Sequence, residues 1–391
     1  MTEHRNRLSL RCLHTALMGA GPESLWGIIE SPLLTRGSTR PQVSDPIPLV
    51  SSTAPSLLTR PQVSDPIPSV SSTAGALLRV EHLSVGFGEH FAIRDLTVEI
   101  GRGEILGFVG ESGSGKTILS LTTLRLAPPT ARISGRIFWR GEDTSGWSEA
   151  RFRPLRGRAI GLVFQGAQAA LHPLQRIGDQ IARVLMLHGK HPRRDAAEEA
   201  RRLLRLVQID DPERRFFQYP RELSGGLCQR AMIALAIAAR PALLIADEPT
   251  SALDVTIQRG ILALLSELRS SMGMSILLIS HDLGVVAEIC DRVAVMYRGK
   301  LVEEAPARQL FTNPKHPYTR LLLESAPHLP GPAKTPEPVR ETVVDPIPST
   351  GCIFAARCVH RMSACAQEPP FQDRDRHRVA CWLSEADVDK E

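Results

Sequence analysis

The chain has 391 residues, of which 42% are hydrophobic, an ordinary share for a globular protein with room for two or three domains. Its formal net charge is +5, and no basic run marks a nucleic-acid-binding face. The longest apolar stretch, 231–246, is interrupted by Arg240-Pro241 and is shorter than the roughly 20 residues of a membrane-spanning helix. Composition therefore favours a globular protein and disfavours nucleic acid as a partner.

Residues 1–75 are rich in proline, serine and threonine, and they contain a tandem duplication in which Thr39–Pro48 recurs as Thr59–Pro68. Prolines remove backbone donors and break helices, and this composition offers little apolar surface to bury. We therefore expect disorder here. The N-terminus shows no apolar segment followed by a small-residue cleavage site, so we expect a cytoplasmic, reducing setting.

From residue 77 onward the apolar pattern changes to that of alternating strands and helices. Residues 174–222 read as helical, and a further helix is expected over 255–268. Strands that alternate with helices predict an α/β fold with a mostly parallel sheet and helices on its faces. The expected strands are, in chain order, 78–85, 91–100, 104–109, 133–139, 159–164, 243–246, 275–280 and 292–297.

The segment Gly110–Thr117 fits the phosphate-loop pattern of Gly, four residues, then Gly-Lys-Thr, and it lies between a predicted strand and a predicted helix. Its glycines let backbone N–H groups and the positive end of the helix dipole face a triphosphate. Lys116 can reach the β- and γ-phosphates, and the Thr117 hydroxyl can ligate Mg²⁺. The residues expected to bind ATP here are Gly110, Glu111, Ser112, Gly113, Ser114, Gly115, Lys116 and Thr117.

Three other strand ends carry polar side chains that suit the same chemistry. The strand 243–246 is followed by Asp247, which we expect to contact Mg²⁺, and by Glu248, which could act as general base toward the attacking water. Gln165 follows another strand, where it could reach Mg²⁺ and water. His281 follows a third and could donate to the γ-phosphate. Upstream, Leu223-Ser-Gly-Gly226 opens a helix and offers a second anion cradle.

In this order and spacing the motifs resemble the ATP-binding subunit of ATP-binding-cassette (ABC) transporters, over about residues 77–325. The resemblance implies a P-loop ATPase with a RecA-like parallel-sheet core, an antiparallel β subdomain and a helical signature subdomain at about 166–225. It also implies that the Phe87 ring stacks on adenine. The equally weighted alternative is that Phe87 is an ordinary residue of the hydrophobic core. In this family two subunits pack head to tail, so that the signature residues Ser224, Gly225 and Gly226 would reach the ATP of the partner. Asp254 is a further residue that the resemblance implies for nucleotide binding.

A narrower resemblance, to the dipeptide/oligopeptide/nickel import branch, is carried by Tyr219–Gly226, Leu244–Gln258, His316–Arg320 and Gly351–Cys358. It implies import of peptides or a related small solute such as nickel. The implied partners are a second ATPase subunit, identical or paralogous, two membrane permease subunits and an extracytoplasmic substrate-binding protein, with this chain peripheral on the cytoplasmic face of the membrane. The alternative is a soluble ABC ATPase of DNA repair or translation. That alternative predicts two cassettes in one chain, a long coiled-coil insertion or a basic stripe, and the sequence shows none of these.

Two stretches depart from the pattern of that branch. Gly166-Ala167 stands where the branch usually has Asp-Pro, and His172-Pro173 where it usually has Asn-Pro. The resemblance implies that this region faces the permease, which puts the specificity of coupling in question. Cys228 follows the signature where a basic or polar residue is usual, which puts the signature half-site in question.

Four of the seven cysteines lie in 326–391, which we expect to be a linker followed by a small cysteine-bearing extension. A tail of this size cannot easily build its own core, so a metal centre would supply stability. The spacings do not fit a zinc ribbon, whereas widely spaced thiolates suit an iron–sulfur cube, and the resemblance implies a [4Fe–4S] cluster. Zinc and free thiols stay as alternatives, and we expect any centre to lie far from the phosphates. The candidate ligands are Cys352, Cys358, Cys365 and Cys381.

Overall fold

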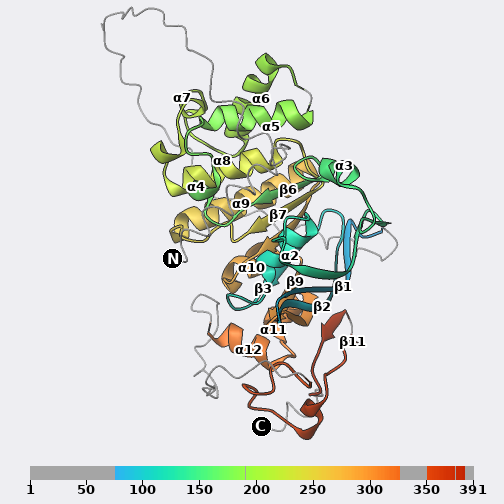
Figure 1. Ribbon diagram of the computed structural model, residues 1–391. Coiled ribbons are helices and arrows are strands. Elements are labelled where there is room, and N and C mark those ends of the chain that lie inside the picture. The colour runs from blue at the N-terminus through green and yellow to red at the C-terminus, as the bar shows by residue number, and fades with distance from the viewer. Residues whose placement is uncertain (1–74, 190, 326–349, 375, 384–391) are drawn as a thin grey trace, which may run out of the picture.

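The computed structural model describes residues 75–189, 191–325, 350–374 and 376–383. Figure 1 shows a central sheet lobe, a helical lobe above it and a C-terminal extension below it. The disorder expected for the N-terminal segment lies outside the described residues, apart from Gly75. The chain thus contains the α/β organisation that its strand and helix pattern predicts.

The main sheet has eight strands in the order β11-β12-β10-β9-β3-β8-β7-β6. The five strands from β9 to β6 run parallel, and β10, β12 and β11 add antiparallel neighbours at one edge. Because β3, β7 and β8 are buried on both faces, they read as continuous apolar runs. The bounds are β3 Ile105–Val109, β6 Ile160–Val163, β7 Leu243–Asp247, β8 Ser275–Ile279, β9 Arg292–Tyr297, β10 Lys300–Pro306, β11 Gln372–Arg374 and β12 His377–Val379.

A second, four-stranded sheet is antiparallel, with the order β2-β1-β4-β5. Its alternating residues bury one face, and Val85 and Ile93 share a hydrophobic cluster with Leu106 and Phe108 of the main sheet. This arrangement confirms the predicted antiparallel β subdomain and its packing on the parallel core. The bounds are β1 Leu78–Phe87, β2 His90–Ile100, β4 Arg132–Trp139 and β5 Glu142–Asp143.

Helices cover the parallel sheet and form the upper lobe of Figure 1. The long helix α9 shows how they are bounded: the Asp254 carboxylate accepts from the Ile257 N–H at 3.0 Å, and Gly273 ends the helix in a left-handed conformation. Among the described helices, none combines the length and the apolar character needed to span a bilayer. The bounds are α2 Lys116–Thr123, α3 Glu149–Phe152, α4 Ala167–Ala170, α5 Ile177–Gly189, α6 Arg193–Leu206, α7 Pro212–Phe216, α8 Gly225–Ile237, α9 Val255–Met272, α10 Leu283–Ile289, α11 Ala307–Thr312 and α12 Pro317–Glu324, with 3₁₀ turns η2 Arg153–Leu155, η3 Pro220–Glu222 and η4 Ser363–Ala366.

The C-terminal extension is built into the sheet lobe. Its strand β12 pairs with β10, where Val379 lies opposite Glu303. The Phe354 ring packs edge-on against Tyr297 at 5.3 Å and lies 5.5 Å from Tyr318, both fully buried. The sequence predicts a metal centre on the premise that a tail of this size cannot easily build its own core. That premise is wrong, because the tail shares the main hydrophobic core of the ATPase domain.

A buried carboxylate fastens two segments to β10. Glu303 is fully buried and accepts hydrogen bonds from the N–H groups of Lys315, at 2.6 Å, and His316, at 3.0 Å. It also pairs with His377 Nε2 at 2.5 Å. These bonds satisfy the charge in the interior and hold the start of α12 and the strand β12 on the same side of the sheet.

Candidate ATP-binding and hydrolysis site

The phosphate loop connects β3 to α2 and passes close to two neighbouring backbones. Gly110 has φ +152°, and a Cβ there would lie 2.1 Å from the Met296 carbonyl oxygen. Gly115 has φ +104°, and a Cβ there would lie 2.2 Å from the Ala92 carbonyl oxygen. Both positions therefore require glycine. The loop closes around Lys116, whose ammonium donates to the carbonyl oxygens of Gly110 at 2.8 Å and Glu111 at 2.9 Å. Burial lowers the pKa of Lys116, and nearby carboxylates, Glu248 first, oppose that shift.

Asp247, at the end of β7, is positioned to hold Mg²⁺ together with Thr117. Its side chain is buried, the Thr117 hydroxyl bonds to it, and its Oδ1 has no protein partner. Burial raises the pKa of Asp247 to about 6. An orphaned, buried carboxylate oxygen beside a hydroxyl fits a hard cation that takes oxygen ligands. Mg²⁺ binding by Asp247 and Thr117 stays a prediction, which this geometry would permit.

Asp247→Asn is expected to stabilise the protein, in the absence of nucleotide and Mg²⁺, by roughly 2 kcal/mol at pH 7. The folded carboxyl has a pKa of about 6, whereas an unfolded one titrates near pH 3.9. The folded state thus binds more protons between these values, and the wild-type free energy of unfolding falls as the pH rises through that window. Denaturant unfolding should show the difference at pH 7 and lose it near pH 4. Equal differences at both pH values would contradict it.

Three predicted catalytic side chains, those of Gln165, Glu248 and His281, lie together at the ends of neighbouring strands. Glu248 follows β7 with φ +48°, and its Oε2 accepts from Gln165 Nε2 at 2.6 Å. Its Oε1 lies 3.1 Å from His281 Nδ1. The carboxyl ends of β6, β7 and β8 bring these residues together although they are up to 116 positions apart in the chain, counting from 165 to 281.

The signature residues lie elsewhere. Ser224 caps α8, where its hydroxyl accepts from the Leu227 N–H at 3.4 Å, and a Cβ at Gly226 would lie 2.8 Å from the Ile257 side chain. Figure 1 shows α8 in the helical lobe, whereas α2 and its phosphate loop belong to the sheet lobe. Ser224, Gly225 and Gly226 therefore lie apart from the phosphate loop of the same chain, and their contact with the ATP of a partner subunit stays a prediction, as does nucleotide binding by Asp254.

Two residues at the margins of the site are clarified. Phe87 is partly buried against the hydrophobic cluster that the antiparallel sheet shares with the main sheet. It lies at the tip of the β1–β2 hairpin, whose residue Ala92 approaches the phosphate loop. Its contact with adenine stays a prediction. Cys228 is fully buried, and its thiol donates to the Pro220 carbonyl oxygen at 3.4 Å, so the side chain points into the protein core.

The extension reaches the phosphate loop directly. Arg357 Nη1 donates to Glu111 Oε1 at 2.9 Å, and the Glu111 N–H donates to the Tyr318 hydroxyl at 3.0 Å. The tail therefore packs on β9 and α12 immediately beside the loop, whereas the expectation that a metal centre lies far from the phosphates stays a prediction. No local sequence signal indicates this contact, although Tyr318 lies in His316–Arg320, one of the stretches that carry the family resemblance.

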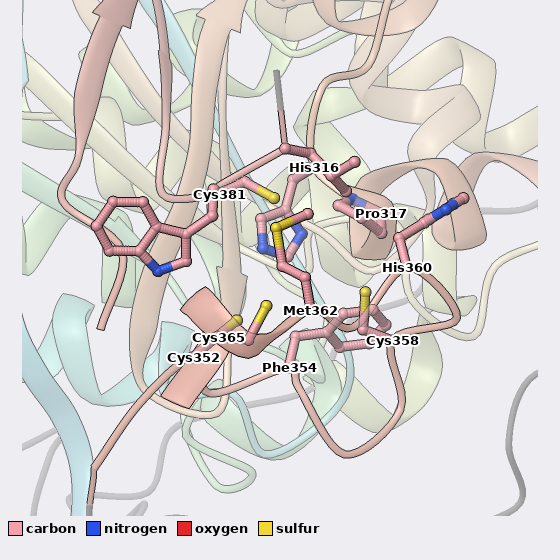
Figure 2. A pocket seen from close by; sticks show the side chains of 11 residues that line it. His316, Pro317, Cys352, Phe354, Cys358, His360, Met362, Cys365 and Cys381 are labelled. Carbon is pink, nitrogen blue, oxygen red and sulfur yellow. The ribbon is translucent and has the colours of Figure 1, made fainter. Parts of the chain in front are cut away.

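The four tail cysteines line one small cavity, which Figure 2 shows between the loops of the extension and the start of α12. The cavity measures about 10 Å³, counted as the space open to the centre of a water molecule, which is room for about one water. Burial raises the pKa of Cys358 to about 12 and that of Cys381 to about 11. Among the described residues, no three His, Cys, Asp or Glu side chains are arranged to share one metal ion.

Comparison with known proteins decides the family. Residues 93–251 match the family described as ABC transporter, and residues 302–365 match the family described as oligopeptide/dipeptide transporter, C-terminal region. A probable peptide ABC transporter ATP-binding protein of Sinorhizobium fredii is 45% identical over 307 residues, covering 76% of this chain and 92% of the relative. This chain belongs to the ATP-binding subunits of ABC transporters. The dipeptide transport ATP-binding protein DppD of Bacillus subtilis is 42% identical over 317 residues, covering 79% of this chain and 95% of its own.

Solved structures of ABC ATPases share the fold. The ATP-binding cassette MJ0796, solved as a dimer in a post-hydrolysis state with ADP and phosphate, matches with a TM-score of 0.53 and 27% identity, over 59% of this chain and 99% of that one. CbiO1 of Clostridium perfringens, part of the cbiONQ transporter complex, matches with a TM-score of 0.54 and 26% identity, over 61% of this chain and 91% of that one. The ABC ATPase assignment implies ATP and Mg²⁺ as ligands.

Proposed function

We propose that this chain hydrolyses ATP to power the import of peptides, or of a related small solute such as nickel, through a membrane permease. The match of residues 302–365 to the oligopeptide/dipeptide transporter, C-terminal region, carries the proposal, because it is a second match, outside the residues that match the general ABC transporter family. Relatives named for peptide and dipeptide transport support it. The alternative, a soluble ABC ATPase of DNA repair or translation, has no comparable support.

The arrangement of side chains supports a specific division of labour in hydrolysis. Glu248 acts as general base toward water, and the 2.6 Å bond from Gln165 and the contact with His281 orient both of its oxygens. Lys116 and the loop N–H groups hold the phosphates. Bound Mg²⁺ would neutralise developing charge on the phosphates, with Thr117, Asp247 and Gln165 as its proposed protein contacts.

The proposed assembly contains a second ATPase subunit, identical or paralogous, together with two permease subunits and an extracytoplasmic substrate-binding protein. The chain would sit on the cytoplasmic face of the membrane, without nucleic acid as a partner. Residues 76–325 are the proposed ATPase domain, and 326–391 the linker and extension. The phosphate loop of one subunit and the Ser224 signature of the other would enclose each ATP.

Co-purification from solubilised membranes tests this assembly. We expect two integral membrane proteins and a second ABC ATPase to remain with the chain, and we expect a peptide-loaded binding protein to stimulate ATP hydrolysis by the complex. The matched control is the same purification with Lys116→Ala, which should retain the partners and lose stimulation. Recovery of ribosomes or DNA-repair proteins, without membrane proteins, would contradict the transport function and favour the alternative.

We also propose that Cys352, Cys358, Cys365 and Cys381 hold a [4Fe–4S] cluster. Their placement around one cavity supports it, because each iron of such a cluster takes a separate thiolate. Thiols with pKa values raised by burial stay protonated near neutral pH unless a metal replaces the proton. Since the cavity admits about one water, the extension must open to accept the cluster.

Anaerobically purified protein is expected to be brown, with about four irons per chain. Cys358→Ser should bleach it and release iron while leaving ATP binding measurable. Cys228→Ala is the matched control, because that thiol lies in α8 and should leave the colour unchanged. Iron content and visible absorption give the readout, and colourless, iron-free wild-type protein from an anaerobic preparation would exclude the cluster.

A further inference from the structure

The phosphate-loop residue Glu111 is held from two sides by segments that do not belong to the nucleotide-binding motifs. Arg357 Nη1 donates to Glu111 Oε1 at 2.9 Å and to Oε2 at 3.2 Å. The Glu111 N–H donates to the Tyr318 hydroxyl at 3.0 Å. Because the Glu111 carbonyl oxygen also accepts from Lys116 at 2.9 Å, any movement of Glu111 is passed to the lysine that faces the phosphates.

Both partners of Glu111 are themselves fixed by packing. The Tyr318 ring is fully buried and lies 4.5 Å from that of Tyr297, measured between ring centroids. Phe354 packs on both rings, and Arg357 Nη1 also donates to the Tyr297 hydroxyl at 3.4 Å. The aromatic cluster therefore joins the extension and the phosphate loop in one packed unit.

Arg357 belongs to the cysteine loop, which we define as residues 351–358. Cys352 and Cys358 of this loop line the small cavity, with Phe354 beside them (Figure 2). The Cys352 N–H fastens the start of the loop by donating to the Cys365 carbonyl oxygen at 2.9 Å. Within the loop, the Cys358 N–H donates to the Phe354 carbonyl oxygen at 3.0 Å. Any change at the cavity that opens the loop must therefore shift Phe354 and Arg357.

We propose that Arg357 and Tyr318 are positioning residues for the phosphate loop, and that through them the closed cysteine loop raises the affinity for ATP. The proposal rests on the proposed role of Glu111 at the ATP phosphates, and it concerns the closed cysteine loop without a metal, because the small cavity must open to accept a cluster. Coupling between two sites is reciprocal, so bound nucleotide must stabilise the closed cysteine loop by the same factor. The cysteine-bearing extension thereby acts as a sensor that adjusts nucleotide binding.

The size of the effect follows from the exposure of the ion pair. The Arg357 side chain is 22% exposed and that of Glu111 is 43% exposed. A pair of this kind contributes modestly, which corresponds to about a two- to fivefold change in an equilibrium constant. Such a change is large enough to measure and small enough to leave the protein folded.

Nucleotide affinity gives the first test, measured calorimetrically with Mg²⁺ and a non-hydrolysable ATP analogue on the full chain. Arg357→Ala should weaken binding about two- to fivefold, and Arg357→Lys should recover part of the loss, because it restores the charge without the planar fork. Arg361→Ala is the matched control, an exposed arginine of the same extension. Equal affinity of Arg357→Ala and wild type would overturn the proposal. Failure of the wild type to bind the analogue would instead contradict the proposed function.

Cysteine reactivity gives the second test, which a merely structural role of Arg357 would not affect. We expect the ATP analogue to slow alkylation of Cys358 in the metal-free protein by about the same two- to fivefold factor. The protection should persist in Arg361→Ala and disappear in Arg357→Ala. Mass spectrometry of the cysteine-bearing peptides follows the labelling. Protection that is equal in wild type and Arg357→Ala would overturn the coupling.

Discussion

Glu248→Gln is expected to lower ATP turnover by one to two orders of magnitude or more while leaving ATP binding intact. The Glu248 carboxylate faces Gln165 and His281. Among the described residues, it makes no hydrogen bond to the phosphate loop. An amide keeps the shape and can still accept a hydrogen bond, but it cannot take a proton from water. The loss therefore falls on the chemical step, and ATP should trap the two subunits in a closed dimer.

Single-turnover hydrolysis and equilibrium binding of ATP, measured on the same preparation, separate the two steps. Glu288→Gln serves as the matched control, since it makes the same substitution at an exposed position of α10 and should leave turnover unchanged. Lys116→Ala should show the opposite pattern, with weakened binding, because it removes the charge that faces the phosphates. Near wild-type turnover for Glu248→Gln would remove Glu248 from the role of general base.

The nucleotide site could be predicted from the sequence because each of its parts is a local motif at a strand end. The phosphate loop, Asp247-Glu248 and His281 each follow a buried apolar strand, and parallel strands end at the same edge of the sheet. Convergence of Gln165, Glu248 and His281 follows from that topology. The sequence therefore contains enough information to place these residues together, although not their hydrogen bonds.

The extension could not be predicted in the same way. Its strands β11 and β12 are three residues each, too short to produce an alternating pattern. The contact between Arg357 and Glu111 joins residues 246 positions apart, and it depends on how Phe354 fills the space beside Tyr297 and Tyr318. Packing of this kind arises from tertiary structure, so the spacing of residues within the tail could not predict that the tail contacts the phosphate loop.

Gly110→Ala is expected to weaken ATP binding at least a hundredfold. A Cβ at this position would lie 2.1 Å from the Met296 carbonyl oxygen and 3.0 Å from the Ser114 hydroxyl, and φ +152° is itself unfavourable for an L-residue. The added Cβ would meet a backbone carbonyl oxygen of the neighbouring strand β9, so the clash cannot be relieved by rotating a side chain. The phosphate loop must move away from β9, which displaces the N–H groups and Lys116 from the positions in which they bind phosphate.

Gly113→Ala provides the matched control within the same loop. Gly113 also has a positive φ, of +80°, but a Cβ there would meet no atom within 4 Å. That substitution carries only the conformational cost of a left-handed residue, about 1–2 kcal/mol, or roughly a fivefold to thirtyfold loss of affinity if the whole cost falls on binding. Equilibrium binding of ATP to both variants, with far-UV circular dichroism to confirm folding, measures the contrast. Equal losses would show that conformational strain, and not the approach of Gly110 to Met296, decides which positions of the loop must be glycine.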